Sequence, residues 1–87
     1  MLTSQMPVHV SSLVVRCLPG QMSSVLSQVN TIKNLQIHAP DNNGKFVVVM
    51  ETDTEKDVLS TISDLEKLNG VLNATLIYHE IDYGENN

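Results

Sequence analysis

The sequence has few of the residues that make disulfide, metal or stacking sites. Its 87 residues include one cysteine, no tryptophan, two tyrosines and one phenylalanine. The single cysteine, Cys17, excludes an internal disulfide framework and fits a reducing compartment. The histidines His9, His38 and His79 stand in separate segments, and no C-x-x-C pair is present. Because a metal site needs several ligands at a recurring spacing, we expect neither a metal nor a cofactor.

Basic residues are also scarce, with five lysines and arginines against ten aspartates and glutamates, for a formal net charge of −5. This charge repels a phosphate backbone, so nucleic acid is not an expected ligand and a basic partner is favoured. No basic residue precedes the apolar part of the N-terminal segment, and no apolar run approaches the length of a membrane span. The sequence therefore predicts a soluble, cytoplasmic protein with no stable membrane insertion.

Patterns typical of catalysis are absent too. The acidic residues fall at turns, helix caps and solvated helix faces, where carboxylates are expected, and no acid–base pair stands out. An acylphosphatase would need a glycine-rich anion loop after the first strand, and CLPGQMSS, which follows Arg16, is a poor match. Cys17 is expected in the core, on the inward face of a strand, and not as a nucleophile. We therefore predict that the chain is not an enzyme and has no catalytic residues.

Two apolar segments give the clearest structural signal. In KFVVVME, from Lys45 to Glu51, the five inner residues are all apolar, and most are β-branched or aromatic. Such a strand is apolar on both faces and belongs in the middle of a sheet. The segment SSLVVRCL, within Val8 to Leu18, has the same character. Both segments are therefore expected to be central strands.

The rest of the chain predicts two helices and two further strands. Apolar residues recur at helical spacing over residues 21–32 and again after the capping sequence TEKD at 54–57. Residues 34–39 and 71–79 predict strands, and PDNNG at 40–44 predicts a hairpin turn. The order β-α-β-β-α-β indicates an α+β fold of the ferredoxin-like, split βαβ type, a four-stranded antiparallel sheet with two helices on one face. We expect a single domain, residues 1–87, with its core at about 8–80 and loose termini.

Polar residues within the strands indicate which face of the sheet the helices leave uncovered. On strand 45–51, for example, Lys45 and Glu51 share a side with Val47 and Val49, so the other side should pack on the helices. The inward residues predicted in this way are Leu13, Val15, Cys17, Phe46, Val48, Met50, Leu72, Ala74, Leu76 and Tyr78. The opposite side, named here the open face, is predicted to carry Val10, Val14, Val47, Val49 and Ile77, with a rim of Ser12, Arg16, Lys45, Glu51, Asn73, Thr75 and His79.

An uncovered apolar face of this kind indicates a binding site. Each aliphatic side chain is worth about 1.5–3 kcal/mol when fully buried, which is enough for an interface before the costs of association. A short amphipathic peptide or helix with basic residues fits the apolar face and the acidic charge. Two alternatives stay open, since a homodimer could cover the same face and valine is also favoured in any exposed strand.

Three segments carry a further signal: SSLVV at 11–15, HAP followed by a glycine turn and FVVVME at 38–51, and NGVL followed by LIYHE at 69–80. Together they resemble the NapD family. The resemblance spans nearly the whole chain, from about Val8 to Glu80, in the same order of elements.

The resemblance implies a function. Members of this family are cytoplasmic assembly chaperones of periplasmic nitrate reductase that adopt the ferredoxin-like fold. They bind the twin-arginine signal peptide of the catalytic subunit NapA as a helix against the sheet, and they restrain export of the NapA precursor until its molybdenum cofactor is installed. The family match carries over Ser12, Val14, Val47, Val49 and His79. The peptide-binding residues predicted from the face and the family together are Val10, Ser12, Val14, Arg16, Val47, Val49, Glu51, Thr75, Ile77 and His79.

A function of another class also remains open. The same fold serves as a small ligand-binding or oligomerising regulatory module, in which subunits pair and a ligand lies between them. A stable dimer that does not respond to the signal peptide would indicate that class.

Overall fold

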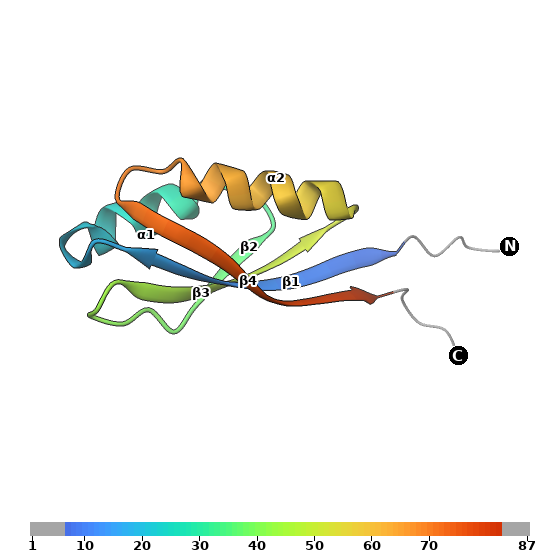
Figure 1. Ribbon diagram of the computed structural model, residues 1–87, viewed down its shortest axis with the longest axis horizontal. Coiled ribbons are helices and arrows are strands. Elements are labelled where there is room, and N and C mark those ends of the chain that lie inside the picture. The colour runs from blue at the N-terminus through green and yellow to red at the C-terminus, as the bar shows by residue number, and fades with distance from the viewer. Residues whose placement is uncertain (1–6, 83–87) are drawn as a thin grey trace, which may run out of the picture.

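The computed structural model describes residues 7–82 (Figure 1). Its elements are β1 (Val8–Cys17), a short 3-10 helix (Pro19–Gln21), α1 (Met22–Val29), β2 (Leu35–His38), β3 (Lys45–Thr52), α2 (Glu55–Glu66) and β4 (Val71–Asp82). The predicted β-α-β-β-α-β order is confirmed. The termini predicted to be loose lie largely outside the described residues, but Glu80, Ile81 and Asp82 belong to β4, so the prediction that the last strand ends at His79 is wrong.

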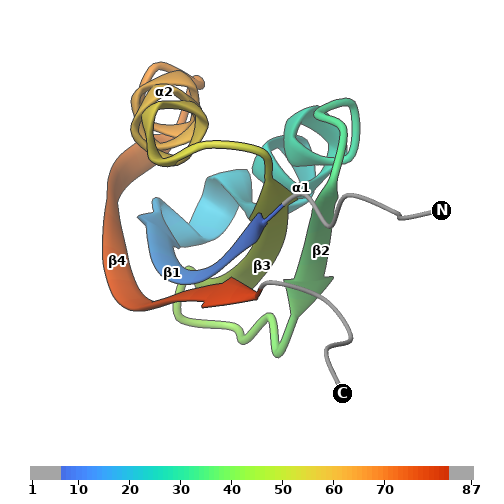
Figure 2. The same cartoon turned by 90° about the vertical axis from the view of Figure 1, so that its right-hand side faces the viewer.

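The strands form one antiparallel sheet in the order β2-β3-β1-β4. The central pair is therefore β1 and β3, the two strands with apolar residues on both faces. Both helices lie on the same side of this sheet (Figures 1 and 2), as right-handed crossovers require. The ferredoxin-like fold predicted from the sequence is confirmed, and one face of the sheet has no helix over it.

The hydrophobic core lies between the sheet and the helices. Its buried residues are Leu13, Val15, Cys17, Val25, Val29, Phe46, Val48, Met50, Val58, Leu65 and Ala74. On α2, Val58, Ile62 and Leu65 follow the helical repeat and face the core. Leu59, which the sequence also placed on this stripe, is 60% exposed because it lies one residue outside the repeat.

The helix boundaries follow from local capping. The Thr54 side chain accepts a hydrogen bond from the Asp57 N–H (3.1 Å), which confirms the predicted N-cap of α2. Helix α1 is shorter than predicted and ends at Val29, with residues 30–32 continuing as a turn from which Ile32 still packs on the core. Neither helix within residues 7–82 is long and apolar enough to cross a membrane.

Strand β4 contains two irregularities that its sequence does not indicate. The β1–β4 register pairs Leu13 with Leu76 but Ser12 with Tyr78, so Ile77 is an extra residue between two pairs. A second shift, between Arg16 and Cys17, leaves Leu72 as an extra residue in the same way. Each bulge reverses the alternation of side chains along the strand beyond it. Leu72 is consequently 61% exposed, although it was predicted to face the helices.

Candidate functional site

The central strands place different side chains on the two faces of the sheet. On β1, Leu13 and Val15 are fully buried against the helices, while Val10 and Val14 point to the open face and are half-buried. On β3, Phe46, Val48 and Met50 are buried in the same way, while Val47 and Val49 are half-buried on the open face. Directly opposite residues of an antiparallel pair share a face, and the register joins Val14 to Val47 and Ser12 to Val49. Val14, Val47 and Val49 therefore lie together in the middle of the open face, and Ser12 separates Val14 from Val10 on β1.

Strand β4 extends this surface along one side. Thr75 lies opposite Val14, so it is on the open face as predicted. Tyr78 lies opposite Ser12 and is 53% exposed, so the prediction that it points inward is wrong. Ile77, at the bulge between these two residues, is 57% exposed. Tyr78 is thus an open-face residue of β4 that simple alternation assigned to the core.

His79 is not on the open face, in contrast to the prediction. It pairs with Ser11, which is buried on the helix side of the sheet, because the bulge at Ile77 reverses the alternation. Its ring stacks on His9, with centroids 5.1 Å apart, and His9 Nδ1 lies 2.8 Å from His79 Nε2. This contact joins the ends of β1 and β4. We therefore assign His79 to the packing of these strands.

Charged residues lie at the two ends of the open face. Glu51 of β3 and Glu80 of β4 are both opposite Val10, one on each side. The Tyr78 hydroxyl donates a hydrogen bond to Glu80 Oε1, and this bond raises the pKa of Tyr78. At the other end, Lys45 is opposite Arg16. Glu80 was not among the predicted site residues, because the sequence placed it in the loose tail.

Of the predicted peptide-binding residues, all but one are therefore gathered on a single face. The register places the following on it: Val10, Ser12, Val14, Arg16, Val47, Val49, Glu51 and Thr75. Ile77 is the extra residue of the bulge and is exposed beside them. His79 is excluded, and Tyr78 and Glu80 are added.

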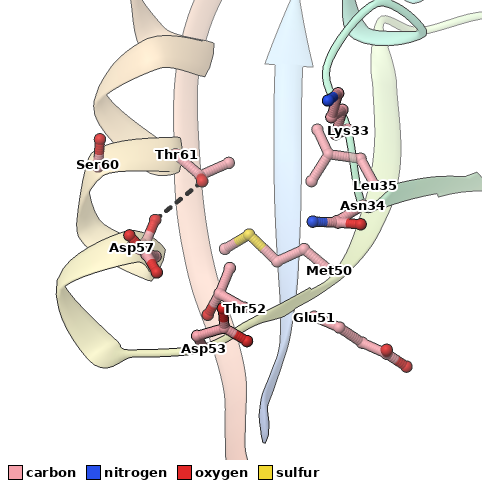
Figure 3. Close-up of a pocket in the computed structure, with 10 residues that line it drawn as sticks. All are labelled: Lys33, Asn34, Leu35, Met50, Glu51, Thr52, Asp53, Asp57, Ser60 and Thr61. Carbon is pink, nitrogen blue, oxygen red and sulfur yellow. Dashed lines mark hydrogen bonds between the residues drawn. The ribbon is translucent and has the colours of Figure 1, made fainter.

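Two hollows lie beside β2 and β3, the first along the open face and the second on the helix side of the sheet. One, of about 280 Å³, is lined by Asn34, Leu35, Gln36, Val49 and Glu51. The other, of about 230 Å³, lies between the start of α2 and the ends of β2 and β3 (Figure 3), and its lining includes Lys33, Glu51, Asp53 and Asp57. It is mostly polar and open to solvent, unlike the apolar, enclosed clefts that hold small-molecule substrates.

Few groups in residues 7–82 are placed for chemistry. No cluster of three or more histidine, cysteine or acidic side chains within this range could hold a metal ion. Cys17 is 2% exposed, its Sγ contacts the Met22 sulfur at 3.7 Å, and burial raises the pKa of its thiol. The buried Ser11 hydroxyl has no hydrogen-bond partner among the described residues. Cys17 and Ser11 both lie on the helix side of the sheet, away from the open face.

The chain is similar to proteins of one family over most of its length. A family model described as NapD protein matches residues 8–83. The chaperone NapD of Haemophilus influenzae is 33% identical over 75 residues, which cover 85% of this chain and 81% of that protein. The chaperone NapD of Escherichia coli K12 is 29% identical over 73 residues, or 83% of this chain and 84% of that protein.

A solved structure supports the same relationship. The solution structure of the Escherichia coli Tat proofreading chaperone protein NapD superimposes with a TM-score of 0.76 and 26% sequence identity. The match covers 91% of this chain and 84% of that one.

Proposed function

The chain belongs to the NapD family of chaperones, which are not enzymes, and we propose that it binds the twin-arginine signal peptide of the nitrate reductase subunit NapA. In this proposal it is a Tat proofreading chaperone that restrains export of the NapA precursor until cofactor insertion is complete. Such a chaperone meets its precursor before export, so we also propose a cytoplasmic location.

The observation that carries the proposal is the uncovered apolar face. On a sheet side that neither helix covers, Val14, Val47 and Val49 lie in the middle and Val10 lies at one end. A signal peptide contains an apolar stretch, and as a helix it presents that stretch along one side. Fully burying an exposed valine contributes roughly 1.5 kcal/mol or more, so several such contacts offset part of the roughly 4–15 kcal/mol that association costs.

Isothermal titration tests this proposal directly. The full chain should bind the NapA signal peptide with measurable heat, and a peptide with both arginines changed to glutamine should bind roughly tenfold more weakly, since it loses its attraction to an acidic protein. A peptide with both arginines changed to lysine keeps the charge and is the matched control. Absence of heat with the native peptide contradicts the proposal.

Self-association is the second candidate, and the edge strand β4 favours it. Leu72, Leu76 and Ile77 are exposed on this strand, whose outer edge pairs with no other strand of the described sheet. Long apolar edges promote pairing between copies, although here Glu66 Oε2 accepts a hydrogen bond from the Ala74 N–H (3.3 Å) and covers part of the edge. Sedimentation distinguishes the two functions, because a concentration-independent dimer that does not change when the peptide is added favours the regulatory module.

A further inference from the structure

The two ends of the open face carry charges of opposite sign. At one end, Glu51 and Glu80 flank Val10 across neighbouring strands, about 10 Å apart at roughly 4.8 Å per strand spacing. At the other end, Arg16 and Lys45 are directly opposite each other. Asn73 is the neighbour of Arg16 on β4 and carries no charge. The face therefore has an acidic end and a basic end, aligned with the strands.

Other charged residues lie near these ends, among them Asp82 of β4, which is opposite Val8 beside the acidic end. The Asp41 carboxylate is close enough to Arg16 and Lys45 for both to lower its pKa, but it is already engaged by the N–H groups of Asn43 (2.9 Å) and Lys45 (3.0 Å). At the acidic end, Lys33 lines the same hollow as Glu51, yet the two side chains point away from each other in Figure 3. Asp41 therefore leaves the Arg16 and Lys45 end positive, and Lys33 leaves the Glu51 and Glu80 end negative.

The distance between the ends matches the length of an apolar peptide segment. Val10 and Arg16 lie about 20 Å apart along β1, at roughly 3.3 Å per strand residue. A helix laid along the strands covers that distance with about 13 residues, at roughly 1.5 Å each. The apolar segment of a signal peptide is roughly 7–15 residues long and follows its basic residues. One such segment therefore fits between the acidic and basic ends, over the valines.

Two independent electrostatic effects favour the same direction. Adjacent arginines on a helix point about 100° apart, so a pair located above Val10 can reach toward Glu51 on one side and Glu80 on the other. The helix macrodipole places partial positive charge at the peptide's N-terminus and partial negative charge at its C-terminus. The first effect favours the arginines at the acidic end, and the second favours the C-terminal end of the helix near Arg16 and Lys45.

We propose that the open face fixes the direction of the bound signal peptide, with its arginine pair between Glu51 and Glu80 and the end of its apolar segment at Arg16 and Lys45. This inference rests on the proposed function and adds which end of the sheet recognises which end of the peptide. It also assigns to Glu80, whose Oε1 already accepts a hydrogen bond from the Tyr78 hydroxyl, a role in orienting the peptide. The direction follows from the charges and their register on the sheet.

Paramagnetic broadening in NMR spectra of the full chain tests this direction. With a nitroxide just before the arginine pair of the peptide, the amide signals of Val10, Glu51 and Glu80 should broaden most, relative to the reduced label. With the nitroxide after the apolar segment, the signals of Arg16 and Lys45 should broaden most. A reversed or even distribution overturns the direction while leaving peptide binding intact. Absence of any spectral change on adding the peptide overturns the proposed function itself.

Charge-neutral variants provide a second test. The double variant Glu51→Gln, Glu80→Gln should bind the native peptide roughly 3- to 10-fold more weakly at low salt, with a smaller loss at high salt. The matched control Asp64→Asn removes an exposed acid on α2, away from the open face, and should leave the affinity unchanged. An equal loss in the control variant shows that only total charge matters, which overturns the assignment to Glu51 and Glu80.

Discussion

At the scale of single residues, Cys17 shows how burial determines chemistry. Its side chain is 2% exposed, and desolvation, followed by the charge of Asp41, raises its pKa above the ordinary value of 9.0. The reactive form of a cysteine is the thiolate, which is disfavoured here twice, by burial and by charge. The sequence predicted this core position correctly, because Cys17 lies on the same inward side of an apolar strand as Leu13 and Val15.

We expect the Cys17 thiol to be inert in the folded chain. Iodoacetamide at neutral pH should label it at least about 100-fold more slowly than in the unfolded chain, because labelling requires opening of the core. The readout is the mass shift over time, with the Cys17→Ser variant as the unlabelled control. Equal rates in buffer and in denaturant would contradict the burial of this side chain.

The residue scale also shows where prediction from the sequence fails. The open-face assignments for β1 and β3 follow from strict alternation and are confirmed by burial. Those for Tyr78 and His79 are wrong, because Ile77 is an extra residue that reverses the alternation. Nothing in LIYHE marks this bulge, since it contains neither glycine nor proline. The contact between His9 and His79 was missed for the same reason.

At the scale of elements, the β2–β3 hairpin depends on one carboxylate. Asp41 Oδ1 accepts hydrogen bonds from the N–H groups of Asn43 and Lys45, and the Asp41 N–H donates to the Lys45 carbonyl. Gly44 follows with φ of +89°, and a Cβ there would lie 2.1 Å from the Cys17 carbonyl oxygen. The sequence PDNNG predicted the turn through its asparagines and glycine, but the role of Asp41 required the structure.

We expect Asp41→Ala to lower the melting temperature at neutral pH, while Asn42→Ala, an exposed neighbour in the same turn, changes it little. The hydrogen bond from Lys45 is the largest cause that lowers the Asp41 pKa in the folded chain. The stability that it contributes is therefore present above the ordinary carboxyl value of 3.8 and is lost as the pH falls through the lowered folded value. Thermal melts across this range measure the effect. An unchanged melting temperature for Asp41→Ala would mean that the backbone alone specifies the hairpin.

At the scale of the whole molecule, two helices cover one side of four strands. This arrangement was predictable, because β1 and β3 are apolar on both faces while a chain of 87 residues has too few helices to cover both. The charge separation along the open face was less predictable, since it depends on which residues lie opposite one another. Glu51 and Glu80 are far apart in sequence and share a row only through the register of β1 with both neighbours.

The central claim is that the two faces of the sheet have different roles, packing on one side and peptide binding on the other. Val48 and Val49 test it as a matched pair, since they are adjacent and identical in type but point to opposite faces. Val48 is fully buried, so Val48→Glu should cost at least about 3 kcal/mol and unfold much of the chain. Val49 is half-buried on the open face, so Val49→Glu should leave the fold intact.

The decisive measurement is the affinity of the Val49→Glu variant for the NapA signal peptide, by isothermal titration, on protein whose circular dichroism spectrum and melting temperature match those of the parent chain. Loss of a buried valine contact and introduction of a charge should weaken binding by roughly tenfold or more. Undiminished affinity in this folded variant, or unfolding of Val49→Glu while Val48→Glu stays folded, would contradict the assignment of the open face.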